Sequence, residues 1–221
     1  MTRALLSSNG DFFGTNRSDL EPFDFVIAVD GGIRHLEKLG IQPDLWVGDM
    51  DSSKALGISE DFIKGVNMER LSEKKDMSDT DYAVSRALEL GAGEITLIGG
   101  IGSRLDHSLF NLNLMFSLTR DGIPCKILDG RQEILFFCIE EGDDSGSEAQ
   151  VFEIDSGLGT TFSIVPFSDI KGLSAEGVEY PLSKKDLSRY SNLTLSNVIT
   201  SERASISAES GMFLIIFSQG Y

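Results

Sequence analysis

The sequence predicts an α/β protein: an N-terminal domain built on a parallel sheet, followed by a C-terminal all-β sandwich. Up to residue 140, short apolar runs alternate with segments of helical periodicity, which is typical of a parallel sheet with right-handed crossovers. After a polar, acidic stretch at 140–150, short alternating runs separated by turn residues replace the helical pattern. We therefore expect two domains, at 1–141 and 150–221.

The N-terminal elements follow from the pattern of apolar residues. Runs rich in β-branched and aromatic residues predict strands at 23–30, 44–49, 94–100, 125–129 and 133–140. Helical spacing predicts helices at 33–39, 78–91 and 105–122. Gly40 and Gly91 are expected to end the first two helices, since glycine adopts the left-handed conformation that follows a helix.

The C-terminal elements are expected to be strands throughout. Short alternating runs at 160–167, 192–199, 204–209 and 212–218 show little helical periodicity. The preceding stretch EEGDDSGSEAQ is acidic and rich in Gly and Ser, as expected of a solvated linker.

Composition restricts the class of protein. A hydrophobic content of 41% with 24% charged residues is typical of a soluble globular protein. The net charge of −16 argues against nucleic-acid and anionic-membrane partners, so a phosphate ligand must be bound locally through metal ions and a few basic groups. Neither a signal peptide nor a membrane-spanning run is evident. Cys125 and Cys138 lack metal-ligand spacing and are expected to be buried free thiols in the cytoplasm.

Three acidic clusters follow predicted strands of the first domain. They comprise Asp30; Asp49 with Asp51; and Asp76, Asp79 and Asp81. Because ligands bind at the carboxyl ends of strands in open α/β sheets, these clusters can converge. Carboxylates without accompanying Cys or His suit Mg²⁺. Each cluster also has a simpler interpretation, as a polar turn at Asp30 or Asp49–Asp51, or as a helix start at Asp79 or Asp81.

A fourth cluster, GGIGSRLDHSLFN at 99–111, follows a strand and precedes a helix. Its glycines permit close approach of a phosphate or an adenine, although the pattern is neither a P-loop nor G-x-G-x-x-G. We expect Arg104 to contact a phosphate and Asp106 and His107 to lie in the first helical turn, with Asn111 able to orient His107.

The motifs VDGG, GDMDS, KDMSDTD and GSRLDH occur in this order, followed by GLSAEGVEYPL and LSNVI. This series resembles the thiamine pyrophosphokinase (thiamine diphosphokinase) family. The resemblance implies a homodimer of two-domain chains, each with an N-terminal α/β domain and a C-terminal β-sandwich. It also implies Mg²⁺-dependent transfer of a pyrophosphoryl group from ATP to the thiamine hydroxyl, giving thiamine diphosphate and AMP.

The resemblance also assigns residues. It implies that Asp49, Asp51 and one of Asp76 or Asp79 are the catalytic, magnesium-binding carboxylates, and it does not decide which aspartate is the general base. The resemblance implies that Asp30 and the Gly99–Asp106 loop belong to the nucleotide site. One of Lys74 and Lys75, directly before an acidic cluster, is expected to meet a polyphosphate, so the predicted ATP site comprises Asp30, Gly31, Lys75, Gly100, Arg104, Asp106 and His107. Ser196 and Asn197 are implied to face thiamine across the dimer interface.

The chain departs from the family pattern in places. Met50 replaces the usual phenylalanine between the two aspartates, and SDTD replaces the more frequent Thr-Asp-Thr-Glu. The single tryptophan is Trp46, so the aromatic partner of thiamine is open, with Phe213 and Tyr180 as candidates. Two other functions fit parts of the pattern: a D-x-D metal-dependent glycosyltransferase, and a nucleotide-sensing module without catalysis.

Overall fold

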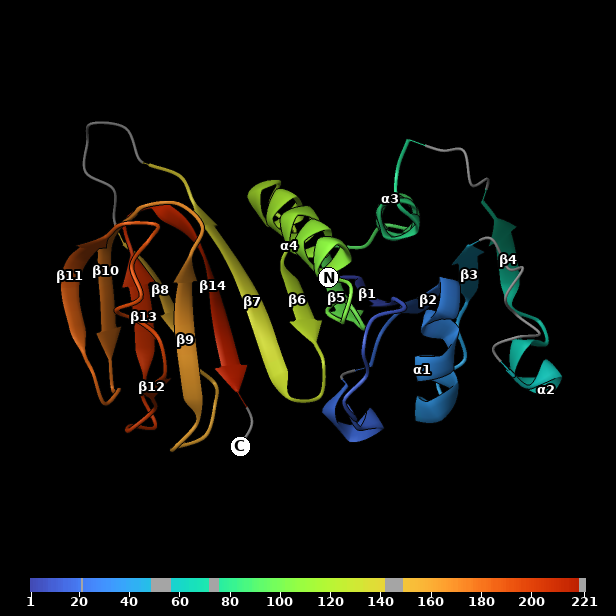
Figure 1. Ribbon diagram of the computed structural model, residues 1–221, viewed down its shortest axis with the longest axis horizontal. Helices are drawn as coiled ribbons and strands as arrows, with labels where there is room; N and C mark the ends of the chain where they lie inside the picture. The colour runs from blue at the N-terminus through green and yellow to red at the C-terminus, as the bar shows by residue number, and fades with distance from the viewer. Residues whose placement is uncertain (21, 49–56, 72–75, 142–148, 219–221) are drawn as a thin grey trace. The chain divides into compact units, whose positions relative to one another are not determined.

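The computed structural model describes residues 1–20, 22–48, 57–71, 76–141 and 149–218 (Figure 1). The chain forms two compact units, one of Met1–Leu118 with Ile123–Gly130 and the other of Thr119–Gly122 with Arg131–Tyr221. The predicted fold class is confirmed, since the first unit is α/β with a parallel sheet and the second is an antiparallel sandwich. The predicted strand at 133–140 belongs to the second unit, so the two units divide near residue 130, earlier than the expected linker.

The first unit contains six parallel strands in the order β6-β5-β1-β2-β3-β4. They are β1 (Arg3–Ser7), β2 (Phe25–Val29), β3 (Leu45–Gly48), β4 (Asn67–Arg70), β5 (Glu94–Ile98) and β6 (Cys125–Leu128). The chain progresses from β1 outward to β4, then returns to place β5 on the other side of β1. The strand order therefore reverses between β1 and β5, which is where open α/β sheets bind ligands.

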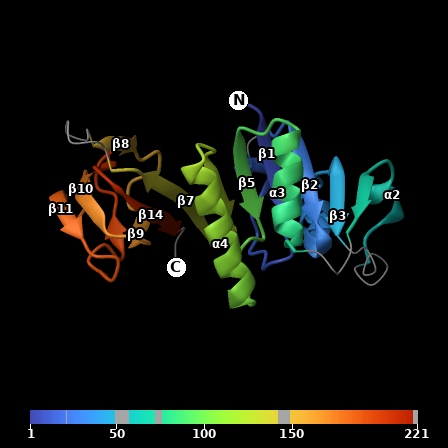
Figure 2. The ribbon, with the colours of Figure 1, turned by 90° about the horizontal axis from the view of Figure 1, so that it is seen from above.

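Helices cover both faces of this sheet. They are η1 (Arg17–Asp19), η2 (Asp30–Gly32), α1 (Ile33–Leu39), α2 (Glu60–Ile63), α3 (Asp79–Glu89) and α4 (Leu105–Arg120). Helix α1 buries Leu36 against Leu5 and Trp46, whereas α3 buries Ala83 and Ala87 and packs on β2. Successive strand residues point to opposite faces of the sheet, so both faces need to be covered. Helix α1 lies on one face and α3 on the other, and α4 lies on the same face as α3 (Figures 1 and 2). No helix within the described residues is long and apolar enough to cross a membrane.

The glycines expected to end helices do so. Gly40 adopts a left-handed φ of 64° after α1, and its N–H donates to the carbonyl of Glu37. Gly91 has a φ of 88° just after α3, and its N–H donates to the carbonyl of Leu88. Both predictions are confirmed, because a residue without Cβ takes this conformation at no steric cost.

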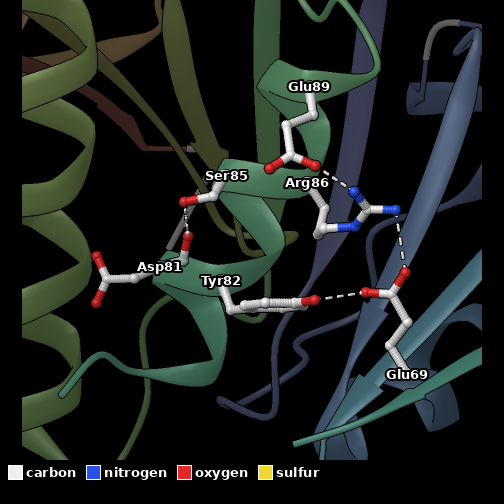
Figure 3. A network of polar contacts seen from close by, with 6 residues as sticks. All are labelled: Glu69, Asp81, Tyr82, Ser85, Arg86 and Glu89. Carbon is white, nitrogen blue, oxygen red and sulfur yellow. Dashed lines mark hydrogen bonds and ion pairs between the residues drawn. The ribbon is translucent and has the colours of Figure 1, made fainter. Parts of the chain in front are cut away.

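The edge strand β4 is joined to α3 by a polar network (Figure 3). The Tyr82 hydroxyl donates to Glu69 Oε2 at 2.8 Å, and Arg86 Nη2 lies 3.0 Å from Glu69 Oε1. Arg86 also pairs with Glu89 one turn later. One carboxylate on β4 thus holds two side chains of α3, whose N-terminus approaches the sheet edge considered below.

The second unit consists of two antiparallel sheets, β12-β9-β14-β7 and β11-β10-β13-β8. Their strands are β7 (Gln132–Ile139), β8 (Gln150–Glu153), β9 (Thr161–Pro166), β10 (Ile170–Glu176), β11 (Leu182–Leu187), β12 (Asn197–Val198), β13 (Ser205–Ala208) and β14 (Gly211–Ser218). One apolar core joins the two sheets, with Phe162 and Phe213 from the first and Leu173 and Ile206 from the second. This face-to-face packing is that of a β-sandwich.

Two expectations about the strands and cysteines need correction. The predicted strand at 192–199 shortens to β12. Before β12, side chains take part in the contact with β9: the Thr194 hydroxyl donates to the Ile164 carbonyl and the Ser196 N–H donates to the Ser163 hydroxyl, beside one backbone bond from the Ile164 N–H to the Thr194 carbonyl. Both cysteines are free as predicted, but only Cys125 is fully buried, and Cys138 is partly exposed.

Candidate functional site

A pocket of about 370 Å³ lies at the carboxyl ends of the parallel strands, where the strand order reverses. Five residues predicted for the site line it: Asp30, Asp79, Gly100, Arg104 and His107. Residues that the sequence analysis did not assign also line it, among them Ser8, Asn9, Gly10, Asp11, Ser78 and Ser103. Within the described residues, Asp30, Asp79 and the loop after β5 therefore meet at one sheet edge, whereas the Asp49–Asp51 cluster lies outside the described residues.

The segment after β1 forms one wall of the pocket. The N–H groups of Ser8, Gly10 and Asp11 donate to the carbonyls of Ile98, Gly99 and Ile101 at 2.8–2.9 Å. These bonds continue the pairing of β1 with β5 beyond the regular strands. A Cβ at Gly10 would collide with the carbonyl oxygens of Gly99 and Ile101, so the two loops can only approach this closely because residue 10 is glycine.

Side chains of α4 hold the loop after β5 through hydrogen bonds. Asn111 is buried, and its Nδ2 donates to the Gly100 carbonyl at 2.7 Å. The Ser108 hydroxyl accepts from the Gly102 N–H at 3.0 Å and donates to the Arg104 carbonyl at 3.1 Å. The expectation that Asn111 orients His107 is therefore wrong, because its amide is directed at the glycine loop instead.

Asp30 is fixed in an uncommon backbone conformation. Its φ is 46°, in the left-handed region that aspartate tolerates better than most residues. The indole N–H of Trp46 donates to its carbonyl at 3.0 Å, and Gly48 lies directly against its carboxylate with no space for a Cβ. Trp46 is thus a buried support for Asp30.

The two aspartates of the motif SDTD, at the start of α3, have different positions. Asp81 forms a capping box with Ser78: the Asp81 N–H donates to the Ser78 hydroxyl at 3.1 Å, and the Ser78 N–H donates to the Asp81 carboxylate at 3.2 Å. Asp79 instead lines the pocket. Asp76 is exposed and is not among the lining residues.

Arg104 and Asp106 form a two-point ion pair on the rim of the pocket. Arg104 Nε and Nη2 donate to the two carboxylate oxygens of Asp106 at 2.9 and 2.7 Å. The guanidinium holds the pKa of Asp106 well below its ordinary value. Arg104 lines the pocket and Asp106 does not, so Asp106 is connected to the pocket through its ion pair with Arg104.

His35, which the sequence analysis did not assign, supports the pocket from α1. The ring is 5% exposed, stacks on Phe12 with centroids 4.8 Å apart, and places Nε2 at 3.0 Å from the Gly10 carbonyl. Its Nδ1 is buried without a partner among the described residues. Burial lowers the pKa of His35, which favours the neutral ring with its proton on Nε2.

The pocket also bears on the predicted metal site. Asp49, Asp51 and Lys75 lie outside the described residues, as does Met50. Within the described part of the chain, no group of three His, Cys, Asp or Glu side chains is arranged to hold a metal ion. The lining does include the carboxylates of Asp11, Asp30 and Asp79, which are the oxygen donors that Mg²⁺ prefers. The donor chemistry of this edge therefore fits magnesium.

The residues predicted to face thiamine lie in the second unit. Asn197 is 6% exposed, and its side chain is bonded to the backbone of Tyr180 and Val198. Ser196 precedes it with a left-handed φ of 58°. Phe213 is fully buried in the sandwich core, which removes it as an aromatic partner for a ligand, whereas Tyr180 is 62% exposed.

Strand β1 was not predicted from the sequence, so the pocket wall formed by Ser8–Asp11 directly after it was not predicted either. The available signal was the apolar run Ala4-Leu5-Leu6 followed by the turn-forming residues Ser-Ser-Asn-Gly. Three apolar residues are too few to distinguish a central strand from an ordinary chain start.

Comparison with known proteins assigns the family. The sequence model described as "Thiamin pyrophosphokinase, catalytic domain" matches residues 18–127, and the "vitamin B1 binding domain" of the same family matches residues 150–213. A thiamine pyrophosphokinase from Bacillus subtilis (strain 168) is 29% identical over 198 residues, which covers 87% of this chain and 86% of that protein.

Solved structures agree with this assignment. The crystal structure of thiamine pyrophosphokinase from Bacillus subtilis superposes with a TM-score of 0.80 at 25% identity, with 100% of both chains covered. The enzyme from Geobacillus thermodenitrificans has the same fold, with a TM-score of 0.77 at 24% identity and coverage of 100% and 98%. Since both domain models of one family match in order along most of its length, the chain belongs to the thiamin pyrophosphokinase family.

Proposed function

We propose that this chain is a thiamine diphosphokinase, which transfers an intact pyrophosphoryl group from ATP to the thiamine hydroxyl and releases AMP. The observation that carries the proposal is the pocket at the reversal point of the sheet, in a chain of this family. It combines carboxylates (Asp30, Asp79) with cationic or hydrogen-bonding groups (Arg104, His107) on glycine-lined loops. Such a set can bind a nucleotide and a cation together.

The proposed roles within the pocket follow from position and charge. Asp30, Gly100, Arg104 and His107 are proposed to bind the nucleotide, and Asp79 is proposed to handle Mg²⁺. Asp49 and Asp51, which lie outside the described residues, and Asp76, which does not line the pocket, are proposed to share the role of Asp79, as the family resemblance implies. Bound Mg²⁺ would neutralise phosphate charge, which lets a strongly acidic chain accept ATP. The protein itself contributes mainly positioning, by holding the thiamine hydroxyl in line with the β-phosphorus.

One of the carboxylates is proposed to accept the proton of the thiamine hydroxyl. Asp79 lines the pocket, whereas Asp76 is exposed outside it. A general base must lie within hydrogen-bond reach of the proton that it removes, so Asp79 is the better candidate.

The second unit is proposed to bind thiamine and to form a homodimer, with Ser196 at the thiamine site. Ser196 lies in the matched vitamin B1 binding region, beside the exposed side chains of Leu193 and Leu195. The first unit also exposes apolar side chains, on α4, at Leu109 and Phe110. Exposed apolar surface of this kind supports a proposed subunit interface, which sedimentation equilibrium can test.

A cytoplasmic location is proposed from the two free cysteines.

The test is product analysis with purified protein, ATP, thiamine and Mg²⁺. We expect AMP and thiamine diphosphate in equal amounts, no AMP without thiamine, and loss of both products when EDTA removes the metal. ADP with thiamine monophosphate would instead indicate transfer of one phosphoryl group. ATP binding with no thiamine-dependent AMP would favour the nucleotide-sensing alternative.

A further inference from the structure

A side-chain contact between α1 and the segment after β1 fixes the orientation of Asn9 in the pocket wall. Arg34 Nη2 donates to Asn9 Oδ1 at 2.6 Å, while Arg34 Nε donates to the Gly31 carbonyl at 3.1 Å. Gly31 packs against the Asn9 amide so closely that a Cβ there would collide with it. One arginine therefore holds both the Asp30–Gly31 turn and the Asn9 amide.

This contact decides which end of the amide is available to a ligand. Since Oδ1 is occupied by a cationic donor, the remaining group, Nδ2, is a hydrogen-bond donor. It has no acceptor among the described residues, and Asn9 lines the pocket. An amide held in this way presents N–H groups to an incoming molecule.

Other donors on this wall are already used. The N–H groups of Ser8, Gly10 and Asp11 donate to carbonyls on the β5 side, so the segment does not offer the row of free backbone N–H groups found in glycine-rich phosphate loops. Arg104, which also lines the pocket, is paired with Asp106. The Asn9 amide is thus a fixed donor on a wall that also carries Asp11, in a pocket that Asp30 also lines.

We propose that Asn9 Nδ2 donates a hydrogen bond to a phosphate oxygen of the nucleoside triphosphate, and that Arg34 is the positioning residue that fixes this orientation. The proposal rests on the proposed function, since it takes ATP as the ligand of this pocket. A polyphosphate offers only acceptors, so a donor amide suits it, and an amide that is already held loses less rotational freedom on binding than a free one. Gly31 has the role of leaving space for the amide.

The test replaces Asn9 by aspartate, which keeps an oxygen for Arg34 but removes the donor. For Asn9→Asp we expect a rise of at least about tenfold in the KM for ATP and in the Kd for ATP by calorimetry, with the KM for thiamine and the thermal midpoint little changed. Asn67→Asp is the matched control: it adds the same charge at the exposed first residue of β4, at the opposite edge of the sheet, and should change neither constant.

Arg34 is tested by the same readouts. Arg34→Met should raise the KM for ATP by about threefold to tenfold without changing kcat, and Arg34→Lys should restore part of the loss, because it retains one donor. An unchanged Kd for ATP in Asn9→Asp, or a change confined to the KM for thiamine, would overturn the proposal. A fall in stability with both KM values unchanged would show a merely structural role. If the wild-type protein makes no thiamine-dependent AMP, the proposed function fails, yet calorimetry with ATP still tests Asn9.

Discussion

The side chain of Asn197 forms with the backbone of Tyr180 the two hydrogen bonds that a neighbouring β-strand would form: its Oδ1 accepts the Tyr180 N–H at 3.0 Å, and its Nδ2 donates to the Tyr180 carbonyl at 2.9 Å. The same oxygen accepts the Val198 N–H at 2.9 Å. The side chain is buried, so these bonds have no competing water. Asn197 therefore acts first on the fold of the segment proposed to face thiamine, and only its remaining N–H is left for a ligand.

Asn197→Ala is expected to lower the free energy of unfolding by about 1–3 kcal/mol, because it leaves backbone groups of Tyr180 and Val198 without partners. Ser196→Ala is the control, since it alters the exposed neighbour and should stay within about 0.5 kcal/mol of wild type. Urea denaturation measures both. Equal stability of the two variants would contradict the structural role of Asn197.

Asp79 and Asp81 are two residues apart on α3 and are expected to differ in function. Asp79→Asn should reduce turnover at least ~100-fold, around 3 kcal/mol of activation barrier, with the fold intact. Asp51→Asn, outside the described residues, is expected to do the same. Asp81→Asn removes an equal charge from the capping box, so it should cost about 1 kcal/mol of stability or less and leave turnover within about threefold. AMP formation and thermal unfolding separate the two effects.

The division between Asp79 and Asp81 illustrates what sequence reasoning could and could not establish for the site. The pattern SDTD located a helix start beside the pocket. Residues that are two positions apart on a helix, however, point in directions about 200° apart around its axis. Only the exact start of the helix therefore decides which carboxylate caps the helix and which lines the pocket. Similarly, the spacing of His107 and Asn111 was compatible with a mutual contact, but Asn111 instead bonds to the glycine loop.

The same limit explains the missed strands. β4 and β11 have mostly exposed side chains, such as Lys184 and Lys185, so neither shows the apolar alternation that identifies a strand. Their pairing is determined by the neighbouring strands β3 and β10 and not by an apolar pattern of their own. The strands that were predicted, such as β2 and β14, carry several buried apolar residues in succession. Burial left a local signal in these two strands and the exposed edge strands left none, but burial alone was not sufficient, since the buried strands β1 and β10 were also not predicted.

His35 is expected to make stability depend on pH. Burial lowers its pKa below the ordinary value of 6.5, with Arg34 and Lys38 acting in the same direction and Asp11 in the opposite one. As the pH falls through 6.5, the unfolded chain binds a proton that the folded chain does not, so the free energy of unfolding falls, with a slope of at most about 1.4 kcal/mol per pH unit. This stability is complete above pH 6.5 and is lost towards the lower pKa of the folded state.

His35→Gln removes the titration and keeps an N–H donor for the Gly10 carbonyl. Denaturant midpoints between about pH 7.5 and 5 should therefore fall less for this variant than for wild type. Parallel curves for the two proteins would exclude His35 as the source of the effect.

Glu69 is expected to control the titration of Tyr82. Because the Tyr82 hydroxyl donates to this carboxylate, ionising the phenol would lose the hydrogen bond and place two negative charges together, which raises the pKa of Tyr82. Glu69→Gln removes the charge and should lower the pKa of Tyr82 towards its ordinary value. Phenolate absorbance during an alkaline titration measures this shift, and Tyr82→Phe identifies the signal.

The same two changes, Glu69→Gln and Tyr82→Phe, in a double-mutant cycle should give a coupling energy of about 0.5–1 kcal/mol, since both side chains lie at the partly exposed sheet edge. A coupling energy of zero would mean that the Tyr82–Glu69 hydrogen bond does not contribute to holding β4 against α3.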